Sequence, residues 1–294
     1  MKQNNRNLEK NAERKSGQPV KQINLHHDVT VVTAYFDIGS FEKGDKSNIY
    51  TPNQYTKWMS TFKFLDNPLY VYVDNRHTEE IFKDIRKDYR DRTKIVLLNK
   101  KDMWAFKLNQ NISDIFSQPN YPRHLPNTVY PDYSCAMHAK YEVMHKSVEE
   151  NAFKTEYFAW HDIGLFRDSL NETQPKFAIQ LPPKFALKRV AYNQVYSPRK
   201  RMLKDIIEGN EVWVSGSFFI AEKKVMRQWV SDYMFFTEEF IRQKWMSTDQ
   251  QVIYGMSQPL IQKDLDKTPV AIQQYHAHKP NDYFGLGYLC RQVI

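Results

Sequence analysis

The sequence predicts an α/β fold with a largely parallel central sheet, because strand-like and helix-like segments alternate along its first third. Residues Val29–Tyr35, Leu69–Val73 and Lys94–Leu98 are apolar and rich in β-branched side chains, as buried strands are. Between them, residues 52–65 carry apolar side chains at three- and four-residue spacing, and His77–Asp88 predicts a short charged helix. Consecutive strands joined by helices need crossover connections, so these strands should be parallel neighbours.

Length and composition indicate a globular protein. The chain has 294 residues, 41% of them hydrophobic and 26% charged, which is enough to bury a core and excludes a wholly disordered chain. Residues 1–25 hold six Lys or Arg against two Glu, and no aromatic residue. We therefore expect a disordered basic tail over residues 1–25, followed by one domain over residues 26–294.

The formal net charge of +8 raises the question of an anionic partner. Half of that charge falls in the tail, and the remainder fits a small anion such as a nucleotide diphosphate. No helix-turn-helix, RNP-like or zinc-finger pattern occurs, so no nucleic acid is expected as a partner, although the tail leaves a nucleic-acid-associated protein as a further alternative. The strand-to-helix turns also lack GxGxxG and GxxxxGK[ST], so neither an ordinary dinucleotide site nor a P-loop is predicted.

Cellular location can be addressed from the cysteines and from hydropathy. Cys135 and Cys290 form neither a disulfide framework nor a metal-binding spacing. No run approaches the roughly 20 apolar residues of a membrane span, and the N-terminus lacks the apolar core of a signal peptide. We expect a cytoplasmic or otherwise soluble protein, or one of the Golgi or secretory lumen if an N-terminal anchor has been removed.

A lysine on an apolar helix face is the first candidate for a binding residue. Ser134–Glu150 predicts a helix, and Lys140 lies within its apolar stripe. Burying an ammonium group costs free energy unless an anion compensates it. Lys140 therefore either extends along the helix edge into water or reaches a bound anion.

Three acidic or histidine features could form one site. Asp162 follows the apolar strand Tyr157–His161, and ligands of open α/β sheets bind where such strands end. Asp249 begins a predicted helix, and His276 and His278 lie near the C-terminus. Asp and His can ligate Mn²⁺ or Mg²⁺, with diphosphate oxygens completing the shell. The alternatives are that Asp162 is a turn residue, that Asp249 is an acid favoured at the start of a helix, and that the two histidines are a surface pair.

Other charged residues could contact the same ligand. Lys140 and Lys279 could neutralise a departing diphosphate. Asp37 and Asp74, each at the end of a predicted strand, are candidates for contacts with ribose or base, with a plain turn role as the alternative.

Several short motifs, in order, resemble the HtrL/YibB family over about residues 28–290. They are Thr33–Gly39, Tyr55–Met59, Tyr70–Asp74, Lys140 with the later Asn151–Gly164, Val214–Phe219, Asp249-Gln250 and Asn281–Leu286. The family is related to GT-A-type glycosyltransferases. The resemblance therefore implies a GT-A-like (Rossmann-like) fold with a mixed, mostly parallel central sheet flanked by helices.

The resemblance also implies an activity. It implies transfer of a sugar from a nucleoside-diphosphate sugar, with a UDP-sugar favoured, to a glycan or other hydroxyl acceptor, assisted by Mn²⁺ or Mg²⁺. Asp162 would stand at the metal-binding acid of a DxD motif, with His276 or His278 as further ligands. Gly216 would belong to the family's Gly-rich acceptor-side strand, in the nucleotide-sugar site. Asp249 is the candidate for the acceptor-side catalytic residue, with sugar binding as its alternative role. Because Asp162 is the only carboxylate at the DxD position, the alternative is an inactive nucleotide-sugar or glycan-binding protein of the same fold.

Overall fold

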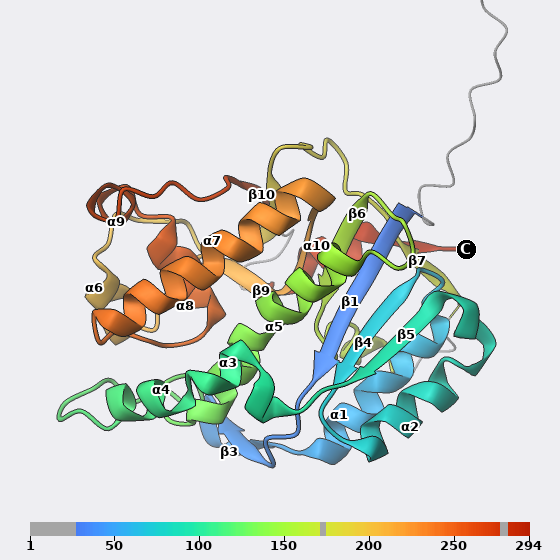
Figure 1. Cartoon of the computed structure of the whole chain (residues 1–294), viewed down its shortest axis with the longest axis horizontal. Coiled ribbons are helices and arrows are strands. Elements are labelled where there is room, and N and C mark those ends of the chain that lie inside the picture. Colours follow the sequence, from blue (N-terminus) through green and yellow to red (C-terminus); the bar gives the residue numbers. More distant parts are fainter. Residues whose placement is uncertain (1–27, 171–174, 277–281) are drawn as a thin grey trace, which may run out of the picture.

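A seven-stranded sheet runs through the protein in the order β10-β8-β9-β6-β1-β4-β5 (Figure 1). The computed structural model describes residues 28–170, 175–276 and 282–294, so the predicted tail lies outside the described residues. The strands of this sheet are β1 (Val29–Tyr35), β4 (Leu69–Val73), β5 (Thr93–Leu97), β6 (Tyr157–His161), β8 (Val190–Gln194), β9 (Val214–Glu222) and β10 (Ile272–His276). Two small sheets pair β2 (Phe41–Lys43) with β3 (Asp45–Tyr50), and β7 (Phe177–Ile179) with β11 (Arg291–Val293).

The sheet is mixed and mostly parallel, which confirms the predicted fold class. β1 is parallel to both β4 and β6, β4 is parallel to β5, and β10 is parallel to β8. Only β9, among the strands of this sheet, is antiparallel to its two neighbours. From β1 the chain first builds outward through β4 and β5 and then returns to the other side with β6, so the strand order reverses between β1 and β6. Open sheets bind ligands outside the carboxyl ends of the strands at such a point.

Helices cover both faces of the sheet, because side chains that alternate along each strand feed two cores. Val32, Tyr72 and Trp160 face the side covered by α5 and α7, which lie along each other (Figure 1), whereas Val31 and Val73 face the side of α1, α2 and α10. The α-helices are α1 (Pro52–Met59), α2 (Arg76–Ile85), α3 (Trp104–Lys107), α4 (Asn109–Phe116), α5 (Pro131–Glu150), α6 (Leu203–Glu208), α7 (Lys223–Arg242), α8 (Asp249–Met256), α9 (Pro259–Asp264) and α10 (Gly285–Cys290).

The predicted elements are present, with shifted ends. The helix predicted over residues 52–65 is α1 followed by a 3₁₀ turn, Ser60–Phe64, and α5 begins three residues before the predicted Ser134 because Pro131 fits the first turn of a helix. Further 3₁₀ helices span Lys87–Arg92, Lys100–Asp102 and Arg167–Ser169. In the described ranges, no helix combines the length and the apolar character that crossing a bilayer requires.

Candidate functional site

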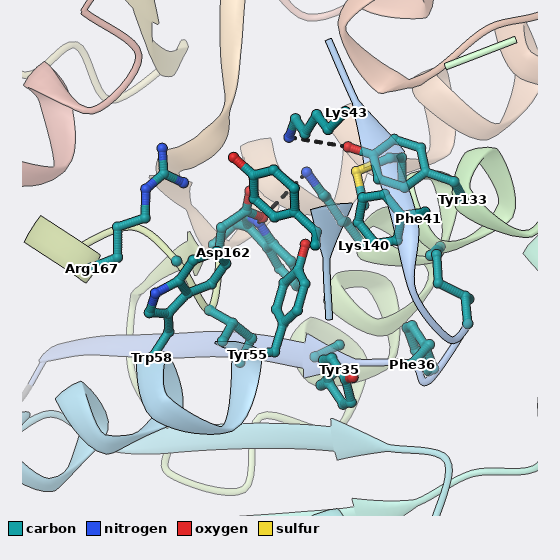
Figure 2. A pocket seen from close by; sticks show the side chains of 18 of the residues that line it. Tyr35, Phe36, Phe41, Lys43, Tyr55, Trp58, Tyr133, Lys140, Asp162 and Arg167 are labelled. Carbon is teal, nitrogen blue, oxygen red and sulfur yellow. Dashed lines mark hydrogen bonds and ion pairs between the residues drawn. The ribbon is translucent and has the colours of Figure 1, made fainter. Parts of the chain in front are cut away.

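A cavity opens at the carboxyl ends of β1 and β6, where the strand order reverses. Tyr35 and Phe36 at the end of β1 form one wall, and Trp160 and Asp162 at the end of β6 form another. The predicted position of Asp162 at a ligand-binding edge of the sheet is therefore matched by a cavity at that edge. Figure 2 shows the side chains around it.

Nine of the twenty residues that line this cavity are aromatic, and we call it the aromatic chamber. Tyr55 packs against both Trp58 and Tyr35, with ring centroids 4.9 and 5.4 Å apart, and Phe41 packs on Tyr133 at 4.9 Å. Rings held in tilted or edge contact keep their positions without a ligand. The aromatic lining of the chamber consists of Tyr35, Phe36, Phe41, Tyr50, Tyr55, Trp58, Tyr133, Trp160 and Phe284.

The hairpin β2–β3 supplies part of this wall and was not predicted from the sequence. It contributes Phe41, Lys43 and Tyr50 to the chamber. Gly39 before β2 and Gly44 between the strands have φ of +76° and +72°, a region that residues with a side chain rarely adopt. These two glycines around a short alternating segment are the signal that could have predicted the hairpin.

Three charged groups from distant parts of the chain meet beside this cavity, and two of them, Lys140 and Asp162, line it. The Nζ atom of Lys140 on α5 lies 3.2 Å from Oδ1 of Asp162 and 3.1 Å from Oδ2 of Asp249, the first residue of α8. The Lys140 side chain is only 4% exposed. It therefore does not extend along the helix edge into water, and the anionic partners that its position demanded are two carboxylates of the protein itself.

The charge state of this cluster follows from its geometry. Burial alone would lower the pKa of Lys140, but the carboxylates of Asp162 and Asp249 outweigh that effect and raise the pKa above its ordinary value. Asp162 Oδ1 also accepts a hydrogen bond of 2.6 Å from Trp160 Nε1. Lys140 is thus a permanent cation. Its Nζ atom also donates a hydrogen bond of 3.1 Å to the Gly216 carbonyl oxygen.

Gly216 on β9 allows the cluster to form. A Cβ atom built at this position would lie 2.2 Å from Asp249 Oδ2, far inside contact distance. Any side chain at residue 216 would push the Asp249 carboxylate away from Lys140. The backbone at Gly216 therefore approaches the Asp249 carboxylate more closely than a residue with a side chain would allow.

A second cavity, the polar chamber, continues from the first on the far side of Lys140. Both cavities are lined by Lys140, Asp162 and Tyr133, so they join at the charged cluster. Polar residues of strand β9, of the start of helix α8 and of several loops complete the second cavity, namely Asn127, Asn210, Ser215, Ser217, Thr248, Asp249, Gln250 and Asp282. One chamber is therefore aromatic and the other polar, with Lys140 between them.

Two further cations, Lys43 and Arg167, line both chambers and were not predicted as site residues. The Arg167 guanidinium lies over the rings of Trp58 and Phe284, 5.5 and 4.7 Å from their centroids, and Lys43 Nζ donates to the Tyr133 hydroxyl at 3.3 Å. Neither forms an ion pair with any acid in the described part of the chain. Unpaired cations that face a cavity are suited to an anionic ligand.

The structure does not support the ribose or base contacts predicted for Asp37 and Asp74, because neither lines a chamber. The Asp74 carboxylate, nearly buried, accepts hydrogen bonds from the Asp37 backbone N–H at 3.0 Å and from Asn75 Nδ2 at 2.8 Å, and it pairs with Lys100 at 3.0 Å. These contacts tie the ends of β1 and β4 together. Strand-end acids with a structural role look the same in sequence as strand-end acids with a binding role.

Of the two histidines predicted as metal ligands, the structure describes His276, and it does not bring His276 to Asp162. His276 is an exposed residue at the end of β10, the outermost strand, three strand spacings or roughly 14 Å from β6. His278 and Lys279 lie outside the described residues. Across residues 28–170, 175–276 and 282–294, no three His, Cys, Asp or Glu side chains group as metal ligands.

Among the predicted metal ligands that the structure describes, Asp162 is the one that lines the cavity. Its Oδ1 is engaged by Trp160 and Lys140, while its side chain is one-third exposed to the cavity. One carboxylate together with substrate phosphates is a usual way of binding Mg²⁺. The residues present therefore fit a metal ion that arrives with a diphosphate, and do not form a preassembled centre.

The fold and the cavity define an α/β protein with a cavity at the reversal point of its sheet. The chain belongs to the family described as bacterial protein of unknown function (HtrL_YibB), whose family model matches residues 27–259, which confirms the resemblance seen in the motifs. No curated protein matches the chain.

Among solved structures, the chain is similar to 4-diphosphocytidyl-2C-methyl-D-erythritol synthase from Anaerococcus prevotii DSM 20548. The identity is 11%, the match covers 89% of this chain and 95% of that one, and the TM-score is 0.35. Because this TM-score is low, the α/β fold is assigned from the strand order and directions of the sheet and not from this similarity.

Two buried histidines beside the cluster are held neutral. His161, between the rings of Phe62 and Phe166, has its pKa lowered by burial to about 4. His138 on α5 lies between Ser134 and Tyr233, and burial lowers its pKa to about 3. His161 packs into the core, so it does not supply the second ligand of a DxD-like pair.

The first prediction concerns the close approach of Gly216 and Asp249. Gly216→Ala should lower the free energy of unfolding by about 2 kcal/mol or more, because the new methyl group collides with a buried carboxylate. Asp249→Ala in the same chain removes the colliding atoms, so the double variant should lose less than the sum of the two single losses. Urea denaturation of the unchanged chain, the two single variants and the double variant measures this coupling, and additive losses would contradict it.

The second prediction concerns pH. The unfolded chain takes up protons at its histidines below about pH 6.5, whereas folded His138 and His161 stay neutral down to about 3 and 4. The free energy of unfolding should therefore fall as pH drops from 6.5 to 5, by about 2 kcal/mol per histidine. His161→Phe should remove about half of this slope in denaturation curves, and an unchanged slope would refute the assignment.

Proposed function

We propose that this protein is a glycosyltransferase that moves a sugar from a nucleoside-diphosphate sugar, with a UDP-sugar favoured, to a hydroxyl group of a glycan or other acceptor. The observation that carries the proposal is the arrangement of the cavity at the sheet's reversal point. An aromatic chamber, a polar chamber and three cations meet there around Lys140. The aromatic chamber suits the base of such a donor, the cations suit its diphosphate, and the polar chamber suits its sugar and the acceptor.

The donor's base would lie in the aromatic chamber, and its diphosphate would lie at the junction of the chambers. Stacking on Tyr or Trp rings accepts any flat base, and Tyr55 and Trp58 are held in place by mutual packing. Lys43, Lys140 and Arg167 surround the junction, where they would neutralise the doubly negative diphosphate. The sugar would then extend into the polar chamber.

The transfer step places the acceptor in the polar chamber. The acceptor oxygen bonds to the anomeric carbon of the sugar while the bond from that carbon to the diphosphate oxygen breaks. The bonding electrons leave with the nucleoside diphosphate, whose added charge the three cations stabilise. The acceptor's hydroxyl proton passes to a carboxylate, for which Asp249 is the candidate because it lines this chamber.

A divalent ion, Mn²⁺ or Mg²⁺, belongs to this proposal as a companion of the donor. Asp162 would hold it together with phosphate oxygens. When bound, such an ion polarises phosphoryl oxygens and adds charge stabilisation to the leaving group. The chain's own contribution is to orient Asp162, through the hydrogen bond from Trp160 and the ion pair with Lys140.

The alternative is a catalytically inactive nucleotide-sugar or glycan-binding protein of the same fold. Its support is that Lys140 engages both Asp162 and Asp249, which leaves neither carboxylate wholly free. Nucleotide binding would be the same in both cases. Turnover of the donor distinguishes them.

The third prediction is that UDP raises the thermal unfolding temperature of the full chain, more than GDP or CMP does and more with Mn²⁺ than with EDTA. A ligand at a hundredfold excess over its Kd adds about 2.7 kcal/mol of stability. Asp162→Asn should remove the effect of Mn²⁺, and Arg167→Gln should reduce the shift with and without metal. Arg90→Gln, an exposed arginine that lines neither chamber, is the matched control.

Several results of this thermal-shift panel bear on the proposal. No shift with any nucleotide would overturn it. A UDP shift that is equal in EDTA and Mn²⁺ would assign the diphosphate to the three cations alone and remove the metal from the proposal. A shift that Arg90→Gln reduces as much as Arg167→Gln would indicate binding elsewhere on the surface.

The fourth prediction separates the enzyme from the inactive binding protein. Release of UDP from the UDP-sugar that gives the largest shift should be measurable, and Asp249→Asn should lower its rate about 100-fold or more, as expected for loss of a general base. The UDP shift should remain in this variant, and Asp264→Asn, an exposed acid, should behave as the unchanged chain. Binding without any UDP release would favour the inactive alternative.

A further inference from the structure

A third cavity continues from the polar chamber to the surface, and we call it the outer groove. It shares Asn210, Val212 and Tyr283 with the polar chamber, so one path runs from the charged cluster to the outside. The groove is lined by Tyr196, Ser197, Arg199, Gly209, Asn210, Glu211, Val212, Tyr254 and Tyr283.

The fold holds the walls of the outer groove in place. Residues 195–201 leave β8 and residues 209–213 enter β9, and the backbone N–H groups of Val195 and Tyr196 donate to the Trp213 carbonyl at 2.9 and 3.2 Å. An ion pair of 2.8 Å between Arg201 and Glu211 joins the same two segments. A groove between segments joined in this way keeps its shape in the absence of a ligand.

The lining of the groove is aromatic and polar, with one aliphatic side chain, Val212. Tyr196 is 45% exposed. Burial, together with the neighbouring Tyr196, raises the pKa of Tyr283 to about 12. Peptide partners usually anchor in pockets that bury large apolar side chains, and this lining offers none. Sugar rings, in contrast, present C–H faces to aromatic rings and hydroxyl groups to polar side chains.

We propose that the outer groove binds the acceptor as a saccharide chain of two or more sugar units. The terminal unit reaches the polar chamber, where Asp249 lies, and the preceding units lie along Tyr196 and Tyr283. The inference rests on the proposed sugar transfer and specifies its acceptor. It assigns a binding role to Tyr196, which lies outside the two chambers that would hold the donor.

The test uses a glycan array that carries monosaccharides and linear oligosaccharides of two to six units, probed with the full chain in the presence of UDP. At least one oligosaccharide should be retained, and its terminal monosaccharide alone should be retained at least tenfold more weakly. Tyr196→Ala should weaken retention at least tenfold, whereas Tyr196→Phe, which keeps the ring, should keep most of it. Tyr288→Ala removes a similarly exposed tyrosine outside the groove and should change nothing.

The UDP thermal shift is measured on the same samples, so that the two proposals can fail separately. A UDP shift without retention of any oligosaccharide overturns the groove assignment and leaves the proposed transferase standing. Equal retention of monosaccharide and oligosaccharide, or retention that Tyr196→Ala leaves unchanged, also overturns it. Tyr196-dependent binding of a protein acceptor in a pull-down, without any glycan retained, would overturn the saccharide class.

Discussion

The buried ammonium group of Lys140 is the interaction on which the site depends. It joins α5 to the end of β6 and to the start of α8 through two carboxylates at 3.1 and 3.2 Å. The buried charges of Lys140 and Asp249 would each cost several kcal/mol to bury alone, so each is tolerated because the other is present, and Asp162 adds a second partner for Lys140. The positions of the three segments are therefore linked by charge. The same constraint requires glycine at residue 216 on β9, because the Asp249 carboxylate occupies the space that a side chain would need there.

Much of this arrangement could be predicted from local signals and one topological rule. The apolar runs set β1 and β4 at their observed bounds, and parallel strands necessarily end at one edge, which places Asp162 there. Lys140 was recognisable because a cation in an apolar helical stripe requires a buried partner. The sequence could not say that the partners would be Asp162 and Asp249, since the three residues are brought together only by packing.

The remaining features depend on long-range placement that sequence patterns do not encode. Asp74 has the sequence context of a ligand-binding acid, but Lys100, which follows β5, takes up its charge. His276 is the last residue of a strand that comes late in the chain, and only the sheet order reveals that this strand lies at the edge, beyond β8. Arg167 gives no periodic signal because it lies in a short 3₁₀ turn, and its role is visible only from the rings beneath it.

In the proposed function, the charges at the junction of the two chambers favour a diphosphate over a neutral sugar. Lys140 with Asp162 and Asp249 carries one net negative charge, and Lys43 and Arg167 reverse it to one net positive charge at the junction. Asp282, which lines the polar chamber alone, makes the two chambers together neutral. Arg167 is held over aromatic rings rather than acids, so an incoming anion does not have to displace a carboxylate to reach it. A dianion would bring the junction to one net negative charge, and a divalent ion at Asp162 would return it to one net positive charge. Under the proposed function, the protein's cations and an accompanying metal would therefore stabilise the same negative charge, and the exposed side of Asp162 is where the metal would bind.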